Sequence, residues 1–112
     1  MERLDFKVTN VGDVAIIELS TDLDNENAGD ALRNAFNSLV ERGQKNIVLD
    51  FDKVEIINSY GLGKVLLCQK KLQLENGVLM VKPLKGFVRE VFEMLMLDPL
   101  FPKYTPESSE QV

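Results

Sequence analysis

The chain has 112 residues, of which 45% are hydrophobic and 28% are charged, and its formal net charge is −5. This length and composition predict one ordinary globular domain, and the negative charge without a long basic run argues against nucleic acid or an anionic membrane as a partner. The chain contains no histidine, which removes Ser-His and Cys-His nucleophile pairs and most zinc sites and so argues against a hydrolase.

The first predicted elements are two strands joined by a tight turn. Apolar and polar side chains alternate over residues 4–9, which is the period-two pattern of a strand with one exposed face. Residues 10–13 supply turn-forming types, and residues 14–19 form a second, mostly apolar strand. We expect an antiparallel hairpin whose first strand lies at the edge of a sheet.

A helix with a clear apolar stripe is predicted next. After a polar segment over residues 20–27, apolar side chains recur at the spacing of one helical face. They are Ala28, Ala31, Leu32, Ala35, Phe36, Leu39 and Val40. The opposite face is polar, and Gly43 is expected to end the helix. The stripe predicts that this helix packs against the sheet.

A strand without polar alternation follows over residues 47–51. Burial on both faces explains such a strand best, as in a parallel sheet covered by helices. After a polar turn and an apolar patch over residues 54–57, a helix is predicted over residues 59–75. Asn58 and Ser59 are both suitable N-cap residues, and the free amides and the dipole of a helix N-terminus favour an anion at that place.

The last elements are a strand and a helix. Asn76 and Gly77 end the preceding helix, residues 78–81 predict a short buried strand, and residues 84–96 predict a helix. Its expected apolar face consists of Phe87, Val88, Val91, Phe92, Leu95 and Met96. Residues 103–105 are expected to contribute a short edge strand.

The domain is predicted to span residues 1–105, with a loose tail over residues 106–112. The N-terminus lacks an apolar segment of signal-peptide length, and no apolar run is long enough to cross a bilayer. We therefore expect a cytoplasmic protein without membrane insertion. The single Cys68 cannot form an internal disulfide and is expected to be a buried thiol.

The segment that runs from the buried strand through Asn58-Ser59-Tyr60-Gly61-Leu62-Gly63 into a helix resembles the signature of the STAS-domain anti-sigma factor antagonists. That family has Asp-Ser-(Ser/Thr)-Gly-Leu-Gly here, and the wider pattern is similar from Leu4 to about Tyr104. The resemblance implies a single STAS-like α/β domain, in which a mixed sheet opens with an antiparallel hairpin and is covered by amphipathic helices. Asn58 replaces the usual Asp, and Tyr60 replaces a small Ser or Thr.

The resemblance also implies a function. Members of the family bind an anti-sigma factor that doubles as a serine kinase, and Ser59 matches the residue that this kinase phosphorylates. The implied partner-binding residues are Asp22, Asp24, Asn58, Ser59, Tyr60, Gly61 and Leu62. The kinase would supply ATP and Mg²⁺, so no catalytic, cofactor or metal-binding residue is expected in this chain.

Two questions stay open at this point. Tyr60 could pack on a neighbouring helix or anchor a partner, since exposed tyrosine is favoured in interfaces. The changes at Asn58 and Tyr60 indicate either a different cognate partner or a loss of phosphorylation. The alternative function is a non-phosphorylated STAS interaction subunit of a transporter-associated or sensor complex. The oligomeric state cannot be predicted.

A second alternative is a magnesium site like that of receiver domains. Asp22, Asp24, Asp50 and Asp52 lie near predicted strand ends and could gather around Mg²⁺. However, a receiver domain begins with a parallel strand that leads into a helix, whereas this chain begins with a hairpin. No lysine suited to such a site is recognised after a late strand. Solvated turn carboxylates are the favoured interpretation.

Overall fold

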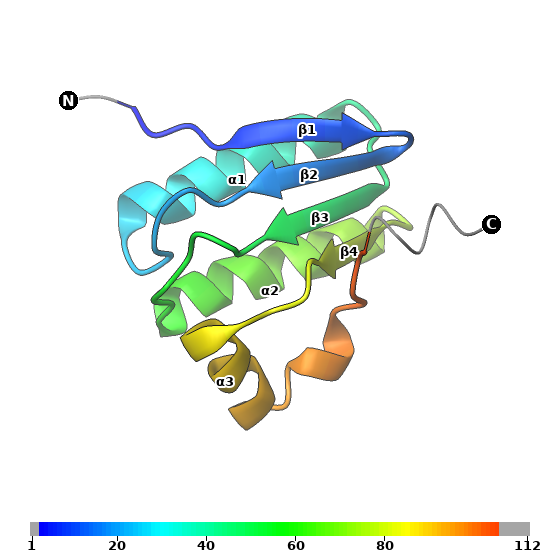
Figure 1. The fold of residues 1–112 in the computed structure, drawn as a ribbon. Coiled ribbons are helices and arrows are strands. Elements are labelled where there is room, and N and C mark those ends of the chain that lie inside the picture. Colours follow the sequence, from blue (N-terminus) through cyan, green and yellow to red (C-terminus); the bar gives the residue numbers. More distant parts are fainter. Residues whose placement is uncertain (1–2, 106–112) are drawn as a thin grey trace.

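A computed structural model describes residues 3–105, and the elements of this part of the chain are shown in Figure 1. They are β1 (Lys7–Val11), β2 (Val14–Glu18), α1 (Glu26–Glu41), β3 (Asn46–Asp50), α2 (Ser59–Leu74), β4 (Val78–Val81), α3 (Gly86–Met94) and a short 3-10 helix, η1 (Asp98–Leu100). The predicted tail over residues 106–112 lies outside the described residues. Within residues 3–105, no helix has the length and apolar character that crossing a membrane requires.

The sheet is mixed and has the strand order β1-β2-β3-β4. β1 and β2 are antiparallel, whereas β2 with β3 and β3 with β4 are parallel. The prediction of an opening hairpin with its first strand at the sheet edge is confirmed. β1 begins at Lys7, later than predicted, because Lys7 pairs with Glu18 at the last position of β2.

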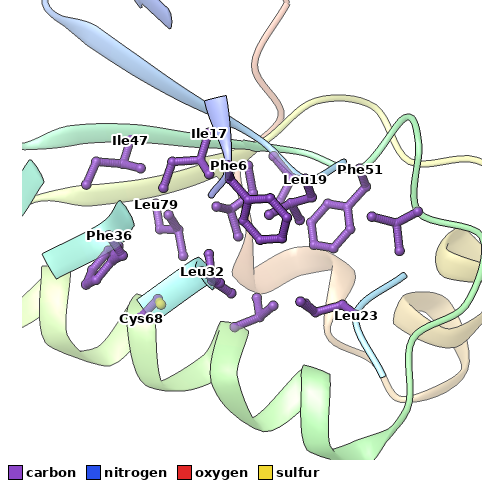
Figure 2. Packing of buried hydrophobic residues seen from close by; sticks show 14 of the residues in the cluster. Phe6, Ile17, Leu19, Leu23, Leu32, Phe36, Ile47, Phe51, Cys68 and Leu79 are labelled. Carbon is purple, nitrogen blue, oxygen red and sulfur yellow. The ribbon is translucent and has the colours of Figure 1, made fainter. Parts of the chain in front are cut away.

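The two faces of the sheet are covered differently. Figure 1 shows α1 and α2 on the same face, and strand residues such as Ile17, Ile47 and Leu79 pack toward them in Figure 2. On the opposite face, Val48 packs with Ile16 and Tyr104. The prediction that β3 is buried on both faces is confirmed, but Tyr104 rather than a helix covers the second face.

The helix α1 forms as its apolar stripe predicted. The Asn25 Oδ1 accepts a hydrogen bond from the Ala28 amide at 3.0 Å, which satisfies one of the unpaired amides of the first turn. Five of the seven predicted stripe residues are buried, and Ala35 and Val40 are half-buried. Gly43 follows the helix at φ +82°, a left-handed conformation that glycine adopts without strain.

The strand β4 lies at the second edge of the sheet, so it is less buried than predicted. Leu79 and Val81 are buried, whereas Val78 is exposed and Met80 is half-buried. Lys103 forms an isolated parallel bridge with Val81, which bears out the predicted edge strand only as a single bridged position.

The last helix is shorter than predicted and buries fewer residues. α3 ends at Met94, and only Val88 and Phe92 are buried within it. Phe87, Leu95 and Met96 are exposed, which contradicts their assignment to an apolar face. The chain reverses at Met96, where φ is +57°, and the buried Phe101 then packs against Phe92, with ring centroids 5.6 Å apart.

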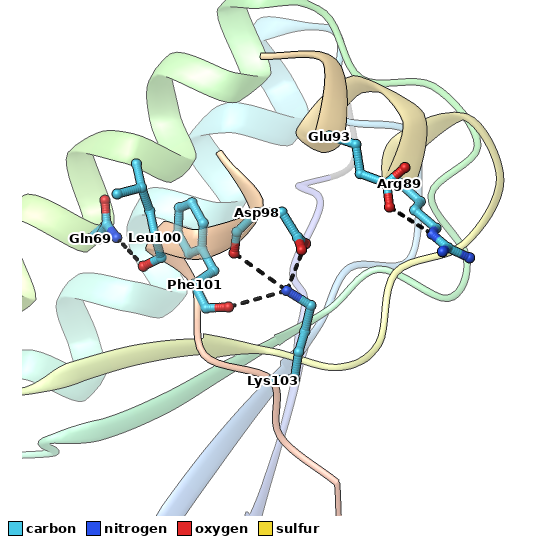
Figure 3. A network of polar contacts seen from close by, with 7 residues as sticks. All are labelled: Gln69, Arg89, Glu93, Asp98, Leu100, Phe101 and Lys103. Atoms are coloured by element: carbon cyan, nitrogen blue, oxygen red, sulfur yellow. Dashed lines mark hydrogen bonds and ion pairs between the residues drawn. The ribbon is translucent and has the colours of Figure 1, made fainter. Parts of the chain in front are cut away.

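Polar contacts hold the segment after α3 in place (Figure 3). The Lys103 Nζ donates to the Asp98 Oδ1 at 2.7 Å and to the Phe101 carbonyl oxygen at 3.2 Å. The Gln69 Nε2 on α2 donates to the Leu100 carbonyl oxygen at 2.6 Å. The contacts of Lys103 hold the C-terminal segment together, and the bond from Gln69 ties it to α2.

Candidate functional site

The candidate site is built on two loops that leave the carboxyl ends of the parallel strands β2 and β3. Leu23 and Ile57 form an isolated parallel bridge between these loops, and the Leu23 amide donates to the Ile56 carbonyl oxygen at 3.0 Å. The Asp22 Oδ1 accepts hydrogen bonds from the amides of Glu55 at 2.8 Å and Ile56 at 3.0 Å. The half-buried Asp22 therefore joins the two loops and fixes the approach to α2.

Asn58 is the N-cap residue of α2. Its Oδ1 accepts a hydrogen bond from the Gly61 amide at 3.0 Å, and its Nδ2 donates to the Asp24 carbonyl oxygen at 3.1 Å. A single side chain thus caps the helix and holds the preceding loop. The sequence allowed either Asn58 or Ser59 as the cap, and the structure places Ser59 one residue later, as the first residue of α2.

Ser59 is exposed, and its hydroxyl has no hydrogen-bond partner within residues 3–105. The backbone amides of Ser59 and Tyr60 also have no acceptor in this part of the chain, because the cap serves Gly61 and the Leu62 amide donates to the Asn58 carbonyl oxygen. The hydroxyl therefore lies at a helix terminus that offers free N–H groups and a favourable dipole to a negative charge.

The ring of Tyr60 packs on α1 at Gly29. A Cβ atom built on Gly29 would lie 2.9 Å from both the Cε2 and the hydroxyl oxygen of Tyr60, so the absence of a side chain at Gly29 makes room for the ring. The Lys64 ammonium group lies 5.3 Å from the ring centroid. Packing on a neighbouring helix was one interpretation of Tyr60, and the residue is still 38% exposed, which leaves part of the ring available to a partner.

Gly61 and Leu62 lie beneath this surface. A Cβ atom on Gly61 would lie 1.9 Å from the Leu23 carbonyl oxygen, and Leu62 is only 7% exposed. Both residues are buried and shape this surface from below, and their expected contact with a partner stays a prediction. The Ser59 surface, as we call it, consists of the exposed Asn58, Ser59 and Tyr60 together with the half-buried Asp24.

The carboxylates that were considered for a magnesium site are engaged elsewhere. The Asp50 Oδ2 lies 3.1 Å from the Lys82 Nζ, the Asp52 Oδ1 lies 3.7 Å from the Lys85 Nζ, and Asp22 binds loop amides. In the described part of the chain, no group of three or more His, Cys, Asp or Glu residues is placed to hold a metal ion. Lys82 directly follows β4, so the statement that no suitable lysine follows a late strand was wrong.

Cys68 lies on α2 and is buried, as expected (Figure 2). Burial raises the pKa of its thiol to about 12, while the nearby ammonium groups of Lys71 and Lys64 act in the opposite direction. Because the thiol stays protonated at neutral pH, Cys68 is a structural residue and not an activated nucleophile.

Comparison with known proteins identifies the class of protein that this fold and this helix terminus define. The STAS domain family matches residues 5–110, and the chain belongs to this family. A relative from Bordetella bronchiseptica, BtrV, which is named a proposed anti-sigma factor antagonist, is 41% identical over 63 residues, or 56% of this chain and 54% of BtrV. The chain thus matches about half the length of this relative.

Solved structures agree with the STAS assignment. A crystal structure of a proposed anti-sigma factor antagonist from Thermotoga maritima, tm1081, has a TM-score of 0.82 at 27% identity, and the match covers 96% of this chain and 93% of that chain. The phosphorylated form of the Bacillus cell fate determinant SpoIIAA is similar in fold, with a TM-score of 0.71 at 24% identity and coverage of 93% and 95%. The predicted fold class and the family resemblance are confirmed.

Two residues of the site were missed in the sequence. Gly29 lies inside the apolar stripe of α1, and a glycine in a helix interior costs stability unless a close approach requires it. A glycine within the predicted helix was therefore the signal in the sequence that another group approaches α1 closely at this position. Lys64 lies on α2, and no local pattern in the sequence indicated that its ammonium group lies over the Tyr60 ring.

Substitutions at Asn58 test the double role of this side chain. Asn58→Asp keeps the cap but cannot donate to the Asp24 carbonyl oxygen, so we expect a loss of about 1 kcal/mol in the free energy of unfolding. Asn58→Ala loses both hydrogen bonds and should cost about 2 kcal/mol. Urea unfolding of the three proteins measures the difference. Equal stability of wild type and Asn58→Asp would show that the bond to Asp24 contributes nothing.

Proposed function

We propose that this STAS protein is an anti-sigma factor antagonist that binds a partner anti-sigma factor through the Ser59 surface and is released when the partner, acting as a serine kinase, phosphorylates Ser59. The observation that carries the proposal is the state of the Ser59 hydroxyl. It is exposed at the first position of α2, and Asn58 provides the helix cap in its place. Modification of this hydroxyl therefore removes no interaction that the fold uses.

The energetics of phosphorylation support a switch that acts on the complex and not on the fold. A phosphate adds about −1.5 to −2 charges at neutral pH and three acceptor oxygens. Within the chain, the free amides of Ser59 and Tyr60 and the dipole of α2 tolerate that charge. A partner docked on the same surface would meet new bulk and new negative charge without such compensation.

The proposal assigns the catalytic machinery to the partner. The kinase would bind ATP and Mg²⁺ and transfer the phosphoryl group, and this chain would provide only the acceptor hydroxyl. The location that follows is the cytoplasm, where ATP and the transcription machinery are found. The exposed Asn58 and Tyr60 and the half-buried Asp24 would contribute to recognition of the partner. Asp22 holds the loops that present them.

The alternative of a non-phosphorylated interaction subunit is favoured by one observation. Asn58 stands where the family has an aspartate, and its amide group donates to the Asp24 carbonyl oxygen, so this side chain serves the fold in a way that a carboxylate cannot. A protein that no kinase has to recognise does not need the aspartate at this position and can have an asparagine there. Incubation with the purified partner and ATP separates the two functions.

The phosphorylation experiment maps the modified residue by mass spectrometry in wild type and in Ser59→Ala. We expect phosphate on Ser59 in wild type and none in Ser59→Ala, whose fold should be unchanged because the hydroxyl has no partner in residues 3–105. Phosphate on another residue, or no phosphate with a partner that binds tightly, would favour the interaction subunit instead.

Gly29→Ala tests whether the Tyr60 ring contributes to partner binding. The new methyl group would displace the ring from α1, while alanine favours the helix by roughly 0.5–1 kcal/mol. We expect partner affinity to fall about fivefold in Gly29→Ala and in Tyr60→Ala, and to fall no further in the double variant. Isothermal titration calorimetry measures all four proteins. Unchanged affinity in Gly29→Ala would exclude a contact that depends on the position of the ring.

A further inference from the structure

A groove between α1 and α2 combines an apolar floor with positively charged sides. It is lined by Arg33, Phe36, Lys64, Leu67, Cys68 and Lys71. Phe36 and Cys68 are buried at its base, whereas Leu67 is 52% exposed at its edge. The cavity in the groove has a volume of about 30 Å³, which is too small for a cofactor but can receive the end of an apolar side chain. We call it the α1–α2 groove.

The charge around the α1–α2 groove is opposite in sign to that of the whole chain. Arg33, Lys64 and Lys71 contribute cations, and no carboxylate lines the groove, although the formal net charge of the chain is −5. Arg33 is paired with Asp30 on α1, with its Nη2 3.3 Å from the Asp30 Oδ1. Lys64 and Lys71 have no carboxylate partner within residues 3–105. The ammonium groups of Lys64 and Lys71 are thus available to a ligand, and the exposed Leu67 lines the same groove.

The outer side of α2 carries two exposed leucines beside its lysines. Leu67 is 52% exposed and Leu74 is 75% exposed, in addition to the buried residues that face the sheet. A helix that packs on one face only usually carries polar side chains opposite that face. The groove is also continuous with the Ser59 surface, because the Lys64 ammonium group at its edge lies over the Tyr60 ring.

We propose that the α1–α2 groove docks an acidic segment of the partner protein, which inserts an apolar side chain beside Leu67 and places carboxylates near Lys64 and Lys71. The inference rests on the proposed function, since the groove would extend the contact that begins at the Ser59 surface. Charge complementarity selects an acidic protein segment, and the apolar floor gives this ligand an advantage over a purely charged one.

The test begins with a titration of the isotopically labelled chain, followed by NMR. The probe is a synthetic amphipathic helical peptide with leucine on one face and glutamate beside it, and the control peptide carries lysine in place of glutamate. We expect the acidic peptide to shift the amide signals of Arg33, Lys64, Leu67 and Lys71, and to bind several-fold more weakly at high salt. The control peptide should not bind.

Matched variants locate the binding. Lys64→Glu and Lys71→Glu should each lower the affinity for the acidic peptide at least tenfold. Lys70 lies on the same helix but outside the groove, so the affinity of Lys70→Glu should stay within twofold of wild type. All three residues lie on the surface, so the fold should survive. The inference would be overturned if the peptide shifted the amide signals of other residues instead. It would also be overturned if neither Lys64→Glu nor Lys71→Glu changed the affinity for the peptide. Preferential binding of duplex DNA, of anionic phosphatidylserine vesicles or of a second copy of the chain would also overturn it.

The same variants separate this inference from the proposed function. If the anti-sigma factor binds wild type and Lys70→Glu but loses at least tenfold in affinity with Lys64→Glu and Lys71→Glu, both the partner and its docking groove are supported. If it binds every variant equally, the groove inference fails and the proposed function stands. If it binds none while the acidic peptide still docks, the groove stands and the proposed function fails.

Discussion

Replacing Phe36 by alanine should lower the free energy of unfolding by about 3–5 kcal/mol, the range measured when a buried aromatic side chain is truncated. Phe36 is 1% exposed and extends from α1 into the main core (Figure 2). Removal of its ring leaves a cavity between α1 and α2, because the surrounding helices and sheet can close only in part. Urea unfolding monitored by circular dichroism gives the value.

Asn34→Ala on the exposed face of α1 is the matched control for Phe36→Ala. It removes a side chain of the same helix without opening the core, so its stability should stay within about 0.5 kcal/mol of wild type. A change for Phe36→Ala as small as that of the control would mean that α1 does not pack on the sheet in solution, which would contradict the fold.

Gly61→Ala should destabilise the protein by more than about 2 kcal/mol, near the upper end of what overpacking costs. The added Cβ atom would lie 1.9 Å from the Leu23 carbonyl oxygen, and this neighbour is backbone that the parallel bridge to Ile57 holds in place. The start of α2 would have to move away from the loop that follows β2. The Ser59 surface would therefore be distorted together with the fold.

Gly63→Ala provides a control two residues further along α2. A Cβ atom on Gly63 meets no other atom within 4 Å, so the substitution should stabilise the helix by roughly 0.5–1 kcal/mol. The same chemical change, glycine to alanine, should therefore lower the free energy of unfolding at position 61 and raise it at position 63. If Gly61→Ala were as stable as Gly63→Ala, the close approach between α2 and Leu23 would not exist in solution.

Much of the fold could be predicted because its elements have strong local patterns. The stripe from Ala28 to Val40 and the apolar run of β3 specify their burial directly. The last helix could not be predicted as well. Leu95 and Met96 follow helical spacing but are exposed, since α3 stops at Met94 and the buried Phe101 packs on Phe92. Phe87 lies within α3 and is exposed as well.

The candidate site was predictable only where its residues are adjacent in the chain. Asn58 and Ser59 stand at a recognisable helix start, and the family resemblance drew attention to them. The contact of Tyr60 with Gly29 joins two helices, and the bonds of Asp22 to the Glu55 and Ile56 amides join two loops. Such contacts depend on how the elements pack, which no local pattern encodes.

The account depends most directly on how the state of Ser59 changes the affinity for the anti-sigma factor. The measurement is isothermal titration calorimetry of the partner with unmodified protein, with protein phosphorylated on Ser59, and with Ser59→Ala and Ser59→Asp. We expect the unmodified protein and Ser59→Ala to bind alike, and the phosphorylated protein and Ser59→Asp to bind at least tenfold more weakly, or about 1.4 kcal/mol. Equal affinity of the phosphorylated and unmodified proteins would contradict the switch.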